Sequence, residues 1–227
     1  MADLDIARPS EHVVLLTLQR PERRNALSTA LRDALSDTLD ALADDDDDDV
    51  RCVVLTGAGP VFCAGFDLRE FELANDDPAF AEALWSSSDR YHRRVLTFPV
   101  PIIAAVNGPA IAGGFDLAVM CDVRIAEVSA VFAHPERTFG PVVYGPLHDL
   151  VGGALARDLC LTGRVLDARA ARKAGLVRDV FPRRELLDAA MEIAAATAEA
   201  PRALLADTKA KAMRLAGVDP DGSTLTL

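Results

Sequence analysis

Long apolar runs and paired cysteines are both missing from this sequence of 227 residues. No apolar stretch is continuous enough to cross a bilayer, and the polar start MADLDIARPSEHVV lacks the basic region and apolar core of a signal peptide. We therefore expect a soluble, cytoplasmic protein that binds no membrane. Because no two cysteines are close in sequence, we interpret them as reduced packing residues, with metal ligands or a redox pair as the alternative. They are Cys52, Cys63, Cys121 and Cys160.

Basic residues are scarce relative to acidic ones. The chain has 24 Lys and Arg against 35 Asp and Glu, a net charge of −11. This balance argues against nucleic-acid binding, but it leaves room for an anionic small molecule at a local basic patch. Six consecutive aspartates, Asp44–Asp49, supply much of the imbalance. We interpret them as a solvated loop, because a calcium site needs oxygen ligands spaced around a turn that contains glycine.

Signatures of nucleotide binding are missing as well. The glycine-rich fingerprint G-x-G-x-x-G would follow the first predicted strand, but the sequence there reads RPERRNAL. A phosphate loop ending in Gly-Lys-Ser or Gly-Lys-Thr is also absent from the sequence. A nucleotide-binding doubly wound sheet is therefore disfavoured.

What the sequence does contain is a regular alternation of short apolar strands and helical periodicity. Half of the residues are hydrophobic, enough for a sizeable core. Strands are predicted at residues 12–19, within 51–59, within 101–108, at 121–126 and at 176–181. Helices are predicted at 29–43 with Ser28 as N-cap, at 79–97, 114–120, 151–161 and 168–174 with Gly175 as C-cap, and in two further segments that Pro201 separates. The alternation predicts an α/β fold in one compact domain with a helical C-terminal extension.

Two segments repeat one design, in which a strand and a turn lead to glycine before a helix. They read LTGAGPVFCAGFDL at residues 55–68 and AAVNGPAIAGGFDL at residues 104–117. Glycine lets the backbone approach a ligand, and unpaired N–H groups at a helix N-terminus stabilise negative charge. The residues alone leave two interpretations open: two ordinary tight turns, or two donors for a developing oxyanion.

With these turns the sequence resembles the crotonase, or enoyl-CoA hydratase/isomerase, superfamily. The resemblance runs from about residue 12 to residue 181 and includes the segments RPERRNAL, VVLTGAGPVFCAGFDLRE, PVPIIAAVNGPAIAGGFDLAVMCDVRIA, FAHPERTFG and LTGRVLDARAARKAGLV, in the family's order. It implies a crotonase-like superhelix of ββα units over residues 1–182. It further implies a helical C-terminal region over 183–227, shorter than usual for the family, and assembly into a homotrimer or hexamer.

The resemblance also implies an acyl-CoA thioester as substrate, with no separate cofactor, since coenzyme A is part of the substrate. In the family pattern A-G-x-D the third position donates one oxyanion-hole N–H, and here that residue is Phe66. In the pattern G-G-G-x-E the middle glycine donates the other. Here it aligns with Gly113, because Ala112 replaces the first glycine. Such a hole fixes the class of reaction but not the reaction itself.

Further substrate-binding positions follow from the same resemblance. Arg23 and Arg24 stand where family members place basic residues near coenzyme A phosphates, and solvated surface charges are the alternative interpretation. The other implied substrate- or coenzyme A-binding residues are Ala64, Asp67, Leu68 and Tyr144.

Two acids carry the expected chemistry. The family's hydratases place one glutamate two residues after the glycine stretch and another twenty residues later, positions that hold Asp116 and Glu136 here. The resemblance implies that they form a catalytic pair, one ionised and one protonated. The alternative for Asp116 is an acid at the start of a helix, favoured there by the helix dipole. The alternative for Glu136 is a surface acid. Aspartate at the first position also occurs in dienoyl-CoA isomerases of the family, which carry a further aspartate where this chain has Tyr144.

The stretch FGPVVYGPLHDLVGG after Glu136 departs from the family. Tyr144 and His148 lie in it and could touch an acyl group, but we interpret both as structural, as we do His92 and His134. The leading hypothesis is an enoyl-CoA hydratase-type lyase of fatty acid metabolism, because both acids keep hydratase spacing. An enoyl- or dienoyl-CoA isomerase and a non-catalytic acyl-CoA-binding protein are the alternatives.

Overall fold

The computed structural model describes residues 2–44, 49–138, 140, 142–219, 221–224 and 226. Most of the acidic run, residues 45–48, lies outside this set, so the prediction of a solvated loop there concerns residues that the structure does not describe. Asp49 is described, and its carboxylate pairs with Arg51.

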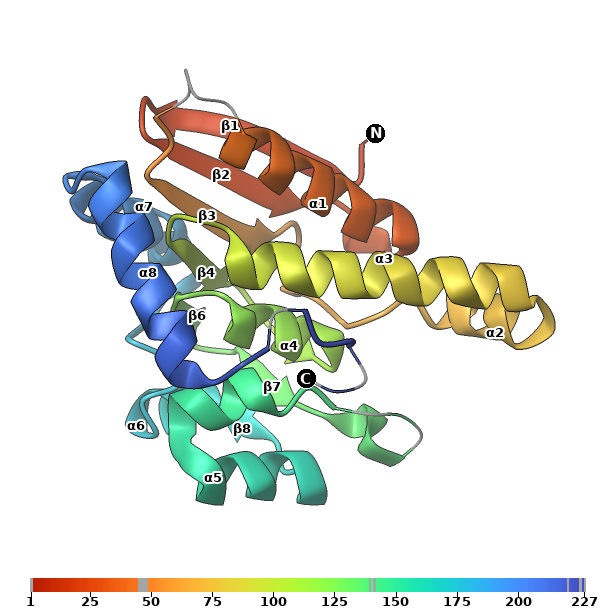
Figure 1. The fold of residues 1–227 in the computed structure, drawn as a ribbon. Coiled ribbons are helices and arrows are strands. Elements are labelled where there is room, and N and C mark those ends of the chain that lie inside the picture. The colour runs from red at the N-terminus through yellow and green to blue at the C-terminus, as the bar shows by residue number, and fades with distance from the viewer. Residues whose placement is uncertain are drawn as a thin grey trace.

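The described chain forms a six-stranded sheet and a three-stranded sheet (Figure 1). The larger sheet has the order β1-β2-β3-β4-β6-β9; only β1 runs antiparallel to its neighbour, and the other pairs are parallel. Its strands are β1 (Leu4–Ser10), β2 (Val13–Leu18), β3 (Cys52–Gly57), β4 (Ile102–Val106), β6 (Val123–Glu127) and β9 (Val180–Phe181). The smaller sheet has the order β5 (Ala110–Ile111), β7 (Val131–Ala133) and β8 (Leu166–Asp167). The predicted α/β class is confirmed.

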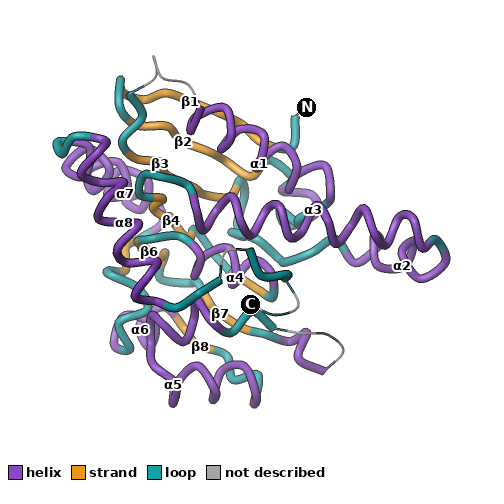
Figure 2. The backbone as a smooth tube through the Cα atoms, viewed as in Figure 1, coloured by secondary structure: helices purple, strands orange, loops and turns teal. Residues whose placement is uncertain are grey.

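The α-helices follow the strands in alternation (Figure 2). They are α1 (Thr29–Asp44), α2 (Leu68–Asp76), α3 (Pro78–Thr97), α4 (Gly113–Met120), α5 (Gly145–Thr162), α6 (Ala168–Lys173), α7 (Arg183–Ala198) and α8 (Arg202–Ala216). Two short 3-10 helices, η1 (Pro21–Arg23) and η2 (Pro135–Thr138), complete the set. Within the described ranges, no helix combines the length and the apolar character that crossing a membrane requires.

Most predicted elements are present, and the differences have physical causes. Ser28 caps α1, since its Oγ accepts the N–H of Leu31 at 3.2 Å. Strand β1 was not predicted, because its exposed edge position leaves most of its side chains in solvent and removes the apolar signal. The predicted strand at 176–181 shortens to its last two residues. Helix α5 begins earlier than predicted and bends at Gly152, whose φ of 75° only glycine adopts readily.

Helices cover both faces of the larger sheet, which explains why its central strands are apolar throughout. Val53 and Leu55 of β3 face one core with α1 and α3, whereas Cys52 and Val54 face a second core with α7. Successive strand side chains point to opposite faces, so burial on both faces requires a continuous apolar run rather than an alternating one. Ala190 and its small neighbours let α7 lie close to the strands.

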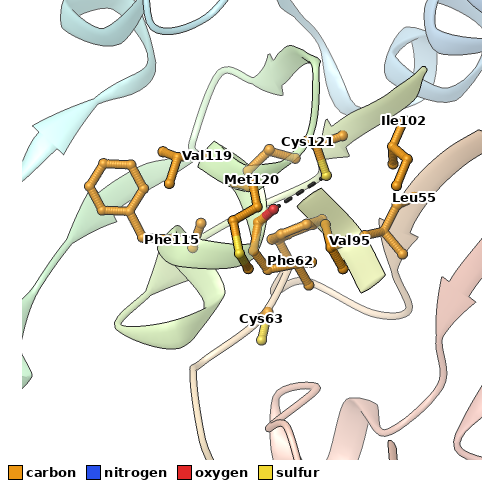
Figure 3. Close-up of a cluster of buried hydrophobic side chains, with 14 of the residues drawn as sticks. Leu55, Phe62, Cys63, Val95, Ile102, Phe115, Val119, Met120 and Cys121 are labelled. Carbon is orange, nitrogen blue, oxygen red and sulfur yellow. Dashed lines mark hydrogen bonds between the residues drawn. The ribbon is translucent and has the colours of Figure 1, made fainter. Parts of the chain in front are cut away.

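Helix α4 lies at the centre of the larger core. Phe115, Val119 and Met120 pack beside Phe62 and Cys63 of the loop after β3 (Figure 3). All four cysteines are buried and free. Burial raises the pKa of the Cys63 thiol to about 12, so it stays protonated and packs as a small apolar group.

One buried side chain ties the loop after β2 to the loop after β3. The Nδ2 group of Asn25 donates to the carbonyl oxygens of Ala58, Val61 and Phe62 at 2.8–3.2 Å. Its Oδ1 accepts the N–H of Arg20 at 3.0 Å. Asn25 has a φ of 54°, in the left-handed region that asparagine tolerates better than most residues. Together with the backbone hydrogen bonds from Leu27 to Gly65 and from Ala64 to Arg24, this side chain holds two loops that carry predicted site residues.

We expect Asn25→Ala to lower the free energy of unfolding by about 2–4 kcal/mol, because it strands buried carbonyls and places alanine at positive φ. Asn75→Ala, at an exposed position on α2, is the matched control and should change it by less than about 0.5 kcal/mol. Urea unfolding followed by circular dichroism measures both. Equal midpoints for the two variants would show that Asn25 does not hold the loops.

Candidate functional site

The two glycine turns of the sequence lie against each other. The N–H of Ile111 donates to the carbonyl of Cys63 at 2.9 Å, and Cys63 also pairs with Ala110 as an isolated β-bridge. A Cβ on Gly65 would lie 2.8 Å from the Cβ of Ala112, so this contact requires glycine. A Cβ on Gly114 would lie 2.2 Å from the carbonyl oxygen of Cys63. Both glycines are therefore explained by close backbone approach between the turns.

This approach places Gly113 next to Phe66. A Cβ on Gly113 would lie 3.6 Å from the nitrogen of Phe66. Gly113 is the first residue of α4, so its N–H has no acceptor within the helix. Among the described residues, neither this N–H nor that of Phe66 donates to another protein atom. The structure thus places Phe66 and Gly113, the two residues that the sequence analysis names, next to each other.

The two predicted acids meet at a histidine. Asp116 lies in the first turn of α4, His134 follows the end of β7, and Glu136 lies in η2. His134 Nδ1 is 2.8 Å from Glu136 Oε1 and 3.7 Å from Asp116 Oδ1. The exposed fractions of Asp116, His134 and Glu136 are 4%, 0% and 9%. Asp116 Oδ1, His134 Nε2 and Glu136 Oε2 are buried without a hydrogen-bond partner.

Burial dominates the electrostatics of this acid cluster, by which we mean Asp116, His134 and Glu136. Loss of solvation raises the pKa of Asp116 well above its ordinary value, and the nearby carboxylate of Glu136 raises it further. Asp116 therefore keeps its proton to higher pH than a solvated aspartate does. A protonated and an ionised carboxyl group beside each other can donate and accept a proton in one reaction.

The same three residues are the candidate metal ligands of the described chain. One donor atom from each lies within 4.8 Å of the others, and two carboxylates with one imidazole suit a divalent transition-metal ion. Two of these donor atoms, His134 Nδ1 and Glu136 Oε1, already share a hydrogen bond of 2.8 Å.

An aromatic row lines the outer side of the first turn. The guanidinium carbon of Arg32 lies 4.7 Å from the ring centre of Phe66, a cation–π contact. The ring of Phe66 contacts that of Phe71 at 6.0 Å, and Phe71 contacts Trp85 at 5.9 Å. Arg32 is fully buried and donates to the carbonyl of Leu27 at 2.7 Å. These contacts fix the residue whose N–H is one of the two free donors.

The predicted coenzyme A-binding residues border the first turn, with differing exposure. Arg23 and Arg24 are exposed, and the carbonyl of Arg24 accepts the N–H of Ala64 at 3.0 Å. Leu68 is 62% exposed at the start of α2. Asp67 caps α2 and its carboxylate pairs with Arg20 at 3.1 Å, so that this group is engaged within the protein.

Tyr144 and His148 stand together at the start of α5, with ring centres 5.5 Å apart. Within the described part of the chain, no hydrogen bond, ion pair or ring contact joins either side chain to the acid cluster. Phe139 and Pro141, in the stretch that departs from the family pattern, lie outside the described residues.

The sequence analysis interpreted His134 as structural, and the structure places its Nδ1 close to both predicted acids. Its polarity just after the buried strand β7, two residues before Glu136, is the sequence signal for this position. His92 does make structural contacts: its Nδ1 lies 2.9 Å from the carbonyl oxygen of Ser88 and 2.9 Å from the hydroxyl of Thr224.

Comparisons with known proteins agree on one family. The family model described as enoyl-CoA hydratase/isomerase matches residues 8–222. The chain is 39% identical over 211 residues to a putative enoyl-CoA hydratase of Thermus thermophilus, covering 91% of this chain and 83% of that one. It is 40% identical over 215 residues to the 2,3-dehydroadipyl-CoA hydratase of Escherichia coli, covering 92% and 82%. The crystal structure of an enoyl-CoA hydratase from Bacillus anthracis superposes with a TM-score of 0.87 at 34% identity, covering 96% of this chain and 84% of that one.

The backbone of Ala112 is strained. The residue caps α4 with φ 54° and ψ −130°, a region that residues other than glycine rarely occupy. We expect Ala112→Gly to raise the free energy of unfolding by about 1 kcal/mol, since relief of strain exceeds the entropy that glycine adds to the unfolded chain. Ala110→Gly, in the strand two residues earlier, is the control and should lower it. Urea denaturation of both variants decides; destabilisation by Ala112→Gly would show that the backbone there is unstrained.

Proposed function

Because the chain belongs to the enoyl-CoA hydratase/isomerase family, we propose that it is a hydratase-type lyase that adds water to a 2-enoyl-CoA. The observation that carries this proposal is the acid cluster, in which Asp116 and Glu136 lie buried around one histidine. The two free N–H groups of Phe66 and Gly113 support it, because Gly113 lies one helical turn from Asp116 on α4.

In this proposal the thioester oxygen accepts hydrogen bonds from the N–H groups of Phe66 and Gly113. Both are main-chain donors held by the contact between the turns, so they need not reorganise as negative charge develops on the oxygen. Electron withdrawal toward that oxygen makes the β-carbon electrophilic and stabilises the enolate that forms when water attacks it. Only interactions stronger in the transition state than in the ground state accelerate the step, and those to a developing oxyanion qualify.

The acid pair moves the protons. The ionised carboxyl group accepts a proton from the attacking water, whose oxygen bonds to the β-carbon. The protonated carboxyl group gives its proton to the α-carbon as the enolate collapses. The raised pKa of Asp116 supports the coexistence of both forms in one site. The pair then exchanges its proton to restore the starting state.

In this proposal coenzyme A is the part of the substrate by which the protein binds it, and no separate cofactor is required. Arg23 and Arg24 are exposed beside the first turn and would bind its phosphates, with Ala64, Leu68 and the backbone around Asp67 along the pantetheine arm. Tyr144 is proposed to border the acyl end. We further propose that the protein acts in cytoplasmic fatty acid metabolism and that it binds neither nucleic acid nor membranes.

We also propose that the chain assembles into a homotrimer or hexamer. Large apolar side chains on or beside α5 and α8 are exposed at 58–89%: Leu161, Val165, Leu204 and Leu215. Helices α5 and α8 contact each other. Exposed large apolar side chains on a surface support a protein interface.

The reaction itself is tested with crotonyl-CoA in oxygen-18 water, by following loss of the conjugated-enone absorbance and the mass of the product. We expect a hydroxyacyl-CoA that carries the label. Asp116→Asn and Glu136→Gln should each lower kcat about 100- to 10,000-fold, and the double variant should lose far less than the product of the two losses. Because burial raises the pKa of Asp116, replacing its ionisable carboxyl group by an amide should leave the free energy of unfolding at pH 7 equal or higher.

A turned-over product without label would contradict the lyase and favour the isomerase, in which one acid substitution is nearly silent. Binding of acyl-CoA without turnover of enoyl-CoA would favour the non-catalytic alternative. Circular dichroism of each variant separates loss of chemistry from loss of fold.

Coenzyme A recognition gives a second prediction. Arg24→Glu should raise KM about tenfold with little change in kcat, because a phosphate contact is equally strong in the ground and transition states. Arg169→Glu, an exposed charge reversal on α6, is the matched control and should leave both constants unchanged. Steady-state kinetics with crotonyl-CoA measures the difference. An unchanged KM in Arg24→Glu would place the phosphates elsewhere.

A further inference from the structure

Arg32 carries its charge at a position of α1 that has no exposed surface. Helices α1 and α3 pack against each other (Figure 1), and the guanidinium group of Arg32 reaches from one to the other. Burying a charge costs folding free energy, and an apolar side chain of similar volume would fill the same space without that cost. Packing alone therefore does not explain why a charged group lies here.

The direction of the Phe66 N–H follows from how the segment around Phe66 pairs with Leu27. These two residues form an isolated parallel β-bridge. The N–H of Leu27 donates to the carbonyl of Gly65 at 2.8 Å, and the N–H of Asp67 donates to the carbonyl of Leu27 at 3.3 Å. Successive N–H groups of an extended segment point to opposite sides. Since the N–H of Asp67 faces Leu27, the N–H of Phe66 faces away from it, and it has no acceptor among the described residues.

Arg32 contacts both the ring of Phe66 and the carbonyl group that anchors its backbone. Nη1 of Arg32 donates to the carbonyl of Leu27 at 2.7 Å, the same oxygen that accepts the N–H of Asp67. The guanidinium carbon lies 4.7 Å from the ring centre of Phe66. The attraction between a cation and an aromatic face is stronger when solvent is excluded, as it is around Arg32. One side chain thus holds the ring of Phe66 and the peptide group that follows it.

The guanidinium group is itself held by three helices. Nη2 donates to Thr29 Oγ1 on α1 at 3.1 Å and to the carbonyl of Leu84 on α3 at 3.2 Å. The carboxylate of Glu70 on α2 lies 3.8 Å from Nη1 and accepts the N–H of Thr29 at 2.9 Å. Burial lowers the pKa of Arg32, and the carboxylate of Glu70 opposes this shift. Because a planar guanidinium offers its donors in a fixed fork, these partners give it one orientation.

We propose that Arg32 is a positioning residue of the reaction, which fixes the direction of the Phe66 N–H through the ring of Phe66 and the carbonyl of Leu27. The inference rests on the proposed function, in which that N–H donates to the thioester oxygen. A donor that is already in place does not reorganise as negative charge develops, and removing one such donor costs roughly a hundred- to a thousand-fold in rate. Loosening the donor without removing it costs less, and it affects the chemical step more than the binding of coenzyme A.

Arg32→Met tests this role in steady-state kinetics, because methionine fills much of the same space without the charge or the donors. We expect kcat for crotonyl-CoA to fall about 10- to 100-fold while KM stays within about threefold. Arg124→Met is the matched control. Arg124 is equally deep in the protein and donates to the carbonyl of Leu176 at 2.8 Å, away from Phe66. It should keep kcat within about threefold, whatever it does to the urea midpoint followed by circular dichroism.

Infrared spectroscopy of bound butyryl-CoA, labelled with carbon-13 at its thioester carbonyl, tests the donor without turnover. We expect wild-type protein to lower the carbonyl stretching frequency relative to free butyryl-CoA, because hydrogen bonds to the oxygen polarise the bond. Arg32→Met should return the frequency part of the way, and Arg124→Met should not. Phe66→Leu keeps the backbone N–H but removes the aromatic face, so it should act like Arg32→Met and decides the matter if Arg32→Met does not fold. The double variant should shift the frequency no further than the larger single shift.

A wild-type carbonyl frequency in Arg32→Met or in Phe66→Leu would overturn the proposal, since stability alone would then explain any loss of kcat. An equal shift in Arg124→Met, or additive shifts in the double variant, would overturn it as well. Wild-type protein that lowers the carbonyl frequency of butyryl-CoA but does not hydrate crotonyl-CoA would refute the hydratase function and leave the role of Arg32 in place. Wild-type protein that does not bind butyryl-CoA at millimolar concentration would refute both.

Discussion

The whole site depends on one close contact between two backbone segments, the loop after β3 and the loop after β4. Gly65 lies where a Cβ would strike Ala112, and Gly114 lies where a Cβ would strike the carbonyl of Cys63. Any larger side chain at either position would push the loops apart. The contact places Gly113 next to Phe66, and it sets the start of α4, from which Asp116 projects. Donors and acid are thus positioned by the same contact.

Rigidity around this contact is supplied by buried polar groups rather than by the apolar core alone. Asn25 binds carbonyls of the loop after β3, and Arg32 holds the ring of Phe66 from the other side. Such groups must be fully bonded to be tolerated inside a protein, which makes them specific in position. The buried polar side-chain atoms without partners in the described chain include three in the acid cluster, from Asp116, His134 and Glu136. A protein interior leaves such atoms unpaired where a substrate or its water completes them.

A strained backbone and a buried carboxyl group both lie at the proposed site. Ala112 occupies a backbone region suited to glycine, and Asp116 is buried beside a second carboxyl group. Both features cost folding free energy, and both lie on the first turn of α4. The continuous apolar strands β3 and β4, covered by helices on both faces, supply the stability that offsets them.

The sequence by itself determined the α/β class, most helix and strand positions and the family, and it predicted the two acids, because these follow from local periodicity and from short motifs with fixed spacing. It also named Phe66 and Gly113, since a motif fixes which residue of a turn offers its N–H. It could not find β1, whose exposed edge carries little apolar signal, nor the place of His134. That residue acquires its meaning only when β7 brings its Nδ1 to Glu136 and toward α4. Only the tertiary structure decided that the pKa of Asp116 is raised, because a pKa depends on burial and on neighbours that come from separate strands and helices.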